Sequence, residues 1–286
     1  MAGFFGLFNY EKLGPGVDKR EPQKKDFVVF FELYFRKFWK LILANLLYVL
    51  VALPVVTVGL ANAGLTYITR NFARQKHAFI PEDFFDTIRK NWKQALPAGI
   101  INLLVTALLL FDMYFFFSWK QGGWMASVFL AISACVYVIF TVMKYYLYMM
   151  MITFKLKLKQ LYKNSFILVG AALGRNALIS LVLLLFYAAG VALLFANFVI
   201  GSVIVLFVYL LLFPAFRSFL IQFTIFPVIK KYMIDPYYKE HPGEDLEQKR
   251  SLNIEDEYTQ AAEEAPVFQD ERLLQPDPEE TDDGTD

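Results

Sequence analysis

Residues 177–197 have the sequence ALISLVLLLFYAAGVALLFAN, which contains no charged side chain. An α-helix rises about 1.5 Å per residue, so this stretch is long enough to cross the roughly 30 Å hydrocarbon core of a bilayer. A helix buried in a soluble protein rarely stays apolar on all sides over such a length. The stretch therefore predicts a membrane-spanning helix.

Long apolar stretches recur through the first four fifths of the chain. Together with the first one, the hydrophobic segments are 41–61, 95–117, 124–143, 177–197 and 201–229. Hydrophobic residues make up 57% of the 286 residues, above the roughly 45–50% of soluble domains. The segments lack the two-residue alternation of barrel strands. The predicted fold class is all-α, a polytopic membrane helix bundle of about five hydrophobic segments.

Charge divides the chain into two parts. Residues 1–234 carry 24 Lys and Arg against 9 Asp and Glu, a net charge of +15, whereas residues 235–286 carry 4 against 18, a net charge of −14. The second part is also rich in proline and poor in apolar periodicity. We interpret residues 1–234 as a membrane domain and residues 235–286 as a disordered acidic tail.

Basic residues near the membrane predict its orientation. Residues 62–94 and 144–176 carry 6 Lys and Arg each, whereas the turns at 118–123 and 198–200 carry one and none. We expect the two basic segments on the cytoplasmic side of a bacterial plasma membrane. The protein is then multi-pass, with its C-terminus in the cytoplasm.

The path of residues 41–65 stays open between two alternatives. Residues 1–40 carry 8 Lys and Arg, and a single crossing would place them outside. Pro54 lies in the middle of the segment and lacks a backbone donor, so the helix should kink or break there. Hydropathy favours a single crossing, whereas charge favours a hairpin that returns to the side it entered from.

Residues 82–94 show the pattern of an amphipathic helix. Acidic residues lie in its first turns and basic residues in its last, which complements the helix dipole. The residues of its apolar face are Phe84, Phe85, Ile88 and Trp92. We predict a cytoplasmic helix lying on the membrane surface, with a helix packed on a neighbouring loop as the alternative.

Small residues at helical spacing predict close helix contacts. Gly170 and Gly174 form a GxxxG motif, and Ala188, Ala192 and Ala196 repeat every four residues on one face. Such positions let helix backbones approach each other in membranes. Chance occurrence in an apolar sequence is an equally good explanation.

Three residues are candidates for a substrate or ion pathway. Asp112 and Arg217 are ionisable groups in apolar segments, where such groups are commonly functional. Pro54 marks a broken helix, a feature of transport sites. The alternatives are that Asp112 reaches the membrane interface and that Arg217 reaches lipid headgroups.

Signatures of catalysis are missing from the sequence. It contains one cysteine, Cys135, and two distant histidines, His77 and His241, without the spacing of a metal site, a nucleophile elbow or a phosphate-binding loop. We therefore expect no enzyme activity, no metal and no cofactor. The basic segments fit anionic lipid better than nucleic acid, so the expected partner is the lipid bilayer.

Three stretches together resemble the YesL-like family of uncharacterised bacterial integral membrane proteins. They are FFGLFNYEKLGPGVDK at 4–19, FFELYFRKFWKLILANLLYVLVALPVVTVGLANAGL at 30–65 and PEDFFDTIRKNWKQAL at 81–96. The resemblance covers residues 1 to about 230. It implies a plasma-membrane location and a link to carbohydrate uptake, and it carries no catalytic residues.

Two functional hypotheses follow. The first is a non-catalytic accessory or scaffold component associated with a sugar permease complex. Self-association is a further expected interaction, separate from this hypothesis. The alternative is a small-solute transporter or channel in its own right. A transporter should move solute when reconstituted alone, whereas an accessory protein should not.

Overall fold

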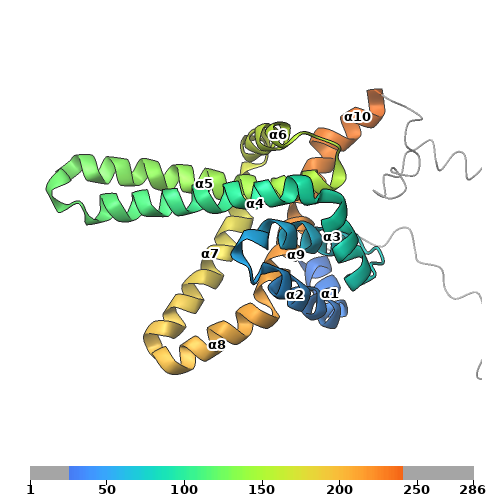
Figure 1. Ribbon diagram of the computed structural model, residues 1–286, viewed down its shortest axis with the longest axis horizontal. Coiled ribbons are helices and arrows are strands. Elements are labelled where there is room, and N and C mark those ends of the chain that lie inside the picture. Colours follow the sequence, from blue (N-terminus) through green and yellow to red (C-terminus); the bar gives the residue numbers. More distant parts are fainter. Residues whose placement is uncertain (1–25, 241–286) are drawn as a thin grey trace, which may run out of the picture. The chain divides into compact units, whose positions relative to one another are not determined.

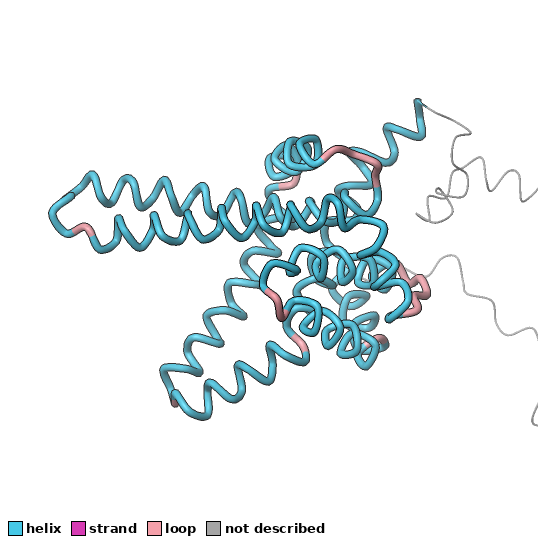
Figure 2. Tube along the Cα trace, viewed as in Figure 1, coloured by secondary structure: helices cyan, strands magenta, loops and turns pink. Residues whose placement is uncertain are grey.

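The computed structural model describes residues 26–240, and every regular element within them is helical (Figure 2). This confirms the all-α membrane class. The described residues fall into two compact units, 26–230 and 231–240. Apart from residues 235–240, the predicted acidic tail lies outside the described residues.

The first unit contains nine α-helices among the described residues (Figure 1). They are α1 (Asp26–Arg36), α2 (Phe38–Ala52), α3 (Val58–Ala73), α4 (Ile80–Ser118), α5 (Gly123–Thr153), α6 (Leu158–Ala171), α7 (Leu173–Ala196), α8 (Phe198–Leu211) and α9 (Phe213–Ile229). Single 3₁₀ turns lie at Val55–Thr57 and Lys120–Gly122. A π-helical turn, Lys230–Ile234, precedes α10 (Asp235–Glu240) of the second unit.

Three of these helices, α4, α5 and α7, are long and apolar enough to cross a membrane. Helices α8 and α9 qualify as a fourth span only when taken together, and the chain bends by 53° between them. The large apolar side chains of α4, α5, α7 and α8 are mostly exposed. Lipid is the solvent that such surfaces require.

The first hydrophobic segment forms a hairpin and not a single helix. Helix α2 ends at Ala52, the chain turns at Pro54, and α3 returns alongside α2 (Figure 1). The Thr57 hydroxyl reaches the carbonyls of Val51 and Pro54 inside this turn. At the open end, the Arg36 guanidinium donates to the Gln75 side chain at 3.4 Å. The 15 residues of α2 span only about 22 Å, so neither arm crosses a bilayer alone.

Backbone contacts at glycines hold the hairpin against α4. A Cβ atom added to Gly59 would lie 2.6 Å from the Cα atom of Gly99, so α3 and α4 touch backbone to backbone at this point. Five residues after Gly59 on α3, Gly64 accommodates the ring of Phe84, which is fully buried. Small residues at such crossings allow the close helix contact that membrane proteins favour.

The predicted small-residue motifs lie elsewhere and make no such contact within the described chain. A Cβ atom at Gly170 or Gly174 would meet no atom within 4 Å. Ala188, Ala192 and Ala196 lie on the exposed side of α7. Within residues 26–240 these faces are therefore uncovered.

The predicted surface helix is the beginning of α4 and not a separate element. The 39 residues of α4 continue from residue 80 into the membrane-spanning part without a break. The expected apolar face is divided, because Phe84 is buried in the core whereas Phe85 and Trp92 are about half exposed. Ile88 packs at the edge of the core. A tertiary contact with α3 therefore replaces part of the expected contact with lipid headgroups.

Gly59, which contacts α4, and Gly170, which is open, should respond differently to an added methyl group. We expect Gly59→Ala to destabilise the protein by about 1–3 kcal/mol, because the backbone of α4 must move away. Gly170→Ala should be neutral or stabilising by up to about 1 kcal/mol, since the position is open and alanine favours helix. Thermal unfolding in detergent measures both. Equal stability of the two variants would contradict the backbone contact.

The hairpin predicts which ends of the helices share one side of the membrane. In a Cys135→Ser background, single cysteines at Lys40 and Lys157 should react with a membrane-impermeant maleimide from the same side. A cysteine at Gln121 should react from the opposite side, because α4 and α5 carry it to the far end of their pair. Labelling of sealed vesicles tests this. Reaction of the Lys40 position together with Gln121 would indicate a single crossing.

Candidate functional site

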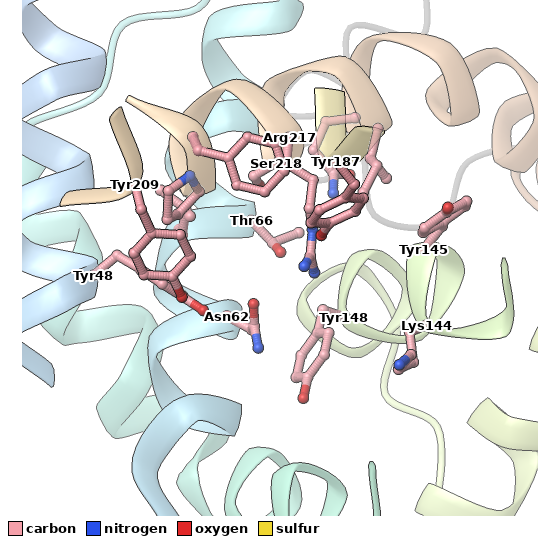
Figure 3. A pocket seen from close by; sticks show the side chains of 15 residues that line it. Tyr48, Asn62, Thr66, Lys144, Tyr145, Tyr148, Tyr187, Tyr209, Arg217 and Ser218 are labelled. Atoms are coloured by element: carbon pink, nitrogen blue, oxygen red, sulfur yellow. The ribbon is translucent and has the colours of Figure 1, made fainter. Parts of the chain in front are cut away.

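A cavity of about 140 Å³ lies inside the first unit, with walls from α2, α3, α5, α7, α8 and α9 (Figure 3). Its walls are unusually polar for a bundle whose outer surface is apolar. Five tyrosines line it, namely Tyr48, Tyr145, Tyr148, Tyr187 and Tyr209. Polar groups in a membrane bundle are costly unless they are partnered or face a solute or water. The cavity is therefore the candidate site.

Two cationic side chains face the cavity from different helices. Arg217 comes from α9 and lines the cavity together with Tyr187 of α7. Lys144 comes from α5, and its ammonium group donates to the Thr106 hydroxyl on α4 at 3.2 Å. None of the described lining residues is acidic. The site thus combines two positive charges with neutral hydroxyl groups.

A chain of hydrogen bonds fixes the side of the cavity next to α4. The Tyr148 hydroxyl accepts from the Asn102 amide on α4 at 3.2 Å. The Tyr162 hydroxyl on α6 donates to the other end of the Asn102 amide at 2.9 Å. Three helices, α4, α5 and α6, are joined in this way, so the Tyr148 hydroxyl has a defined position.

The Asn45 side chain pairs with the backbone groups at the break between α8 and α9. In a continuous helix the Leu210 carbonyl would accept from the residue four positions later, but Pro214 has no N–H group. The fully buried Asn45 amide donates to that carbonyl at 2.6 Å, and its oxygen accepts from the Ala215 N–H at 2.8 Å. One side chain on α2 therefore replaces two backbone interactions of the bent helix pair.

The cavity wall depends on this bend. Tyr209 precedes the break, Pro214 lies in it, and Arg217 and Ser218 follow it on α9, and all four line the cavity. The Ser218 hydroxyl lies 2.7 Å from that of Thr69 on α3, which ties α9 to the hairpin. The bend thus sets where the Arg217 guanidinium enters the site.

A second asparagine acts similarly between α6 and α7. The Asn176 amide donates to the Val169 carbonyl at 3.1 Å, near the end of α6, and its oxygen accepts from the Tyr146 hydroxyl at 2.6 Å. Asn197 caps α8 by accepting from the Ile200 N–H at 3.0 Å. Asn45, Asn176 and Asn197 therefore serve helix ends and breaks, whereas Asn102 joins tyrosines of two other helices.

A separate cluster of cations lies at the end of α3. Arg70 is buried, donates to the Thr153 hydroxyl at 3.0 Å and lies over the Tyr67 ring. Arg74 lies over the ring of Phe226. Burial, together with repulsion from Arg70, lowers the pKa of Arg74 to about 10. Burial, followed by repulsion from Arg74 and Arg70, lowers the pKa of Lys76 to about 8. This cluster joins α3 to α5 and α9 outside the cavity.

Of the three predicted pathway residues, the structure places only Arg217 in the cavity. Asp112 lies near the far end of α4, and Pro54 forms the exposed turn of the hairpin. Lys144 was missed because it follows the third apolar segment and resembles an interfacial lysine. The five tyrosines come from four helices, and no local spacing in the sequence connects them. Within the described residues, no three His, Cys, Asp or Glu side chains gather as a possible metal site.

Residues 41–113 match the family described as protein of unknown function, DUF624. The matched region covers most of α2, the turn at Pro54, α3 and most of α4. It includes the cavity residues Tyr48, Asn62 and Thr66 and the bridging Asn45, but neither Arg217 nor Lys144. The match is to this broad family and does not distinguish the YesL-like group. No match was found among curated proteins or among solved structures.

The Asn45 bridge can be tested through its dependence on Pro214. Asn45→Leu should cost about 1–3 kcal/mol for each backbone group left without a partner. In a Pro214→Ala background the Leu210 carbonyl regains an N–H donor, so the same substitution should cost less. Unfolding in detergent of the two single variants and the double variant measures the coupling. Strictly additive losses would contradict the bridge.

Proposed function

We propose that this membrane-spanning helical protein binds a small polar solute in the cavity and moves it across the bacterial plasma membrane. The observation that carries the proposal is a polar cavity inside an apolar bundle, beside two interrupted helix pairs. Helix breaks next to a central site are the arrangement that transporters use to bind solutes and to change access to them.

The two breaks differ in what they contribute. The α8–α9 bend places Tyr209 and Arg217 in the cavity wall. The α2–α3 hairpin supplies Tyr48, Asn62 and Thr66 from its two arms. Neither arm of the hairpin is long enough to cross a bilayer alone, and the Thr57 hydroxyl pairs with the carbonyls of Val51 and Pro54 within its exposed turn. Movement of either element would alter access to the cavity.

The charge distribution and the hairpin together support the proposed orientation. With both arms of the hairpin opening to the same side, the 8 basic residues of 1–40 join those of 62–94. The positive-inside rule then places these segments and the C-terminus in the cytoplasm. The turns at 118–123 and 198–200 face outward.

Transport by the protein alone is the decisive test. Purified full-length chain should take up at least one member of a panel of neutral polyols, sugars and small organic acids in proteoliposomes. Thr66→Phe, which fills the cavity, should reduce that uptake at least tenfold. Ala192→Phe adds the same side chain to the exposed face of α7 and should leave uptake unchanged. Uptake by none of the panel, or equal uptake by both variants, would sink the proposal.

A second candidate function is an accessory component of a sugar permease complex, and self-association is a separate expected interaction. The exposed face of Ala188, Ala192 and Ala196 favours it, because a close-packing surface on α7 has no partner within the described chain. The resemblance to the YesL-like family supports the link to carbohydrate uptake.

Crosslinking in native membranes separates the two functions. A cysteine at Ala192, in a Cys135→Ser background, should capture a sugar-permease subunit in a constant ratio if the accessory function is correct. Recovery of the protein alone, combined with uptake by the purified chain, would leave transport as the function. A cysteine at Leu104, on the exposed side of α4, is the matched control.

A further inference from the structure

The charges around the cavity do not balance within the described chain. Arg217 and Lys144 both line it, and they are close enough to repel each other electrostatically. No Asp or Glu between residues 26 and 240 lines the cavity or forms an ion pair with either cation. The Lys144 ammonium group donates to the Thr106 hydroxyl, which is not a counter-ion. Two like charges in a membrane bundle are unfavourable unless an anion joins them.

The shape of the two cations suits an oxyanion. A guanidinium group presents paired N–H donors that match the oxygens of a carboxylate or phosphate, and an ammonium group adds a point charge. Arg217 comes from α9 and Lys144 from α5, so the two charges enter the cavity from different walls (Figure 3). An anion between them would join α9 to α5.

A further polar group indicates what else the ligand carries. The Gln222 side chain is buried and lines the cavity, and its Oε1 atom has no hydrogen-bond partner in the described part of the chain. A buried acceptor without a donor is costly. A ligand with a hydroxyl group would supply that donor, and the tyrosine hydroxyls can pair with further hydroxyls.

We propose that the cavity binds a small hydroxylated oxyanion, a hydroxy acid or a polyol phosphate, whose charge is held by Arg217 and Lys144. This proposal rests on the proposed solute site and names its substrate class. The anionic group lies between the two cations, and a hydroxyl of the ligand donates to Gln222. The same chemistry is present in a soluble anion and in the headgroup of a glycerophospholipid.

A three-carbon series tests the charge requirement with little change in size. Glycerol, glycerate and glycerol 3-phosphate carry no charge, one negative charge and about two at neutral pH. Isothermal titration of the delipidated full-length protein should show at least tenfold tighter binding of one of the two anions than of glycerol. Arg217→Gln should remove that preference. Arg175→Gln, at an exposed arginine on α7, should retain it.

Controls keep the result interpretable. Lys144→Gln gives an independent loss if Arg217→Gln fails to fold, which size-exclusion elution and thermal unfolding report. Binding of glycerol as tightly as its charged relatives, or binding of none of the three, would overturn the proposal. If the wild type takes up neutral solutes and the Thr66→Phe variant does not, the proposed transport function stands even when the oxyanion proposal fails. The two proposals can therefore be tested separately.

Native mass spectrometry distinguishes the two sources of the anion. A glycerophospholipid that copurifies with the wild type and is lost in Arg217→Gln would assign the site to a lipid headgroup. Binding of glycerate or glycerol 3-phosphate to protein that carries no such lipid would assign it to a soluble anion. Either result supports the oxyanion chemistry.

Discussion

The hydrogen bonds of Asn45 are the constraint on which the cavity depends. A membrane offers no water to satisfy a free backbone group, so an interrupted helix must be completed by protein. Pro214 removes one donor from the α8–α9 pair, and Asn45 supplies both the missing donor and an acceptor for Ala215. The same contact fastens α2 to α9, and it thereby fixes the bend that directs Arg217 into the interior.

Close backbone contact between α3 and α4 is the second requirement. The hairpin can pack along α4 only because Gly59 and Gly99 meet without side chains between them. With α3 held there, Asn62 faces the cavity beside Tyr148, and Thr69 reaches Ser218 on α9. The backbone contact between Gly59 and Gly99, neither of which lines the cavity, therefore helps to position the polar groups on α3.

The distribution of charge separates structural cations from those available to a ligand. Arg70 is engaged by the Thr153 hydroxyl and the Tyr67 ring, so it joins helices. Lys144 has a hydroxyl partner, and no acidic side chain of the described chain lines the cavity beside Lys144 and Arg217. Asp112 is the most conspicuous ionisable group in the sequence, but it does not line the cavity. It lies near the α4–α5 turn, far along the chain from the helix breaks.

The sequence by itself determined the membrane class, the three long spans and the position of the break at Pro54, because these depend on local hydropathy and on the missing proline donor. It also identified Arg217 as a candidate. Only the tertiary structure decided that residues 41–65 form a hairpin, that Gly59 and not Gly170 makes the close contact, and that Lys144 shares a cavity with Arg217. These features are contacts between residues distant in the chain. In a membrane helix the pattern of apolar residues does not show which face meets which neighbour, because lipid and protein interior are equally apolar.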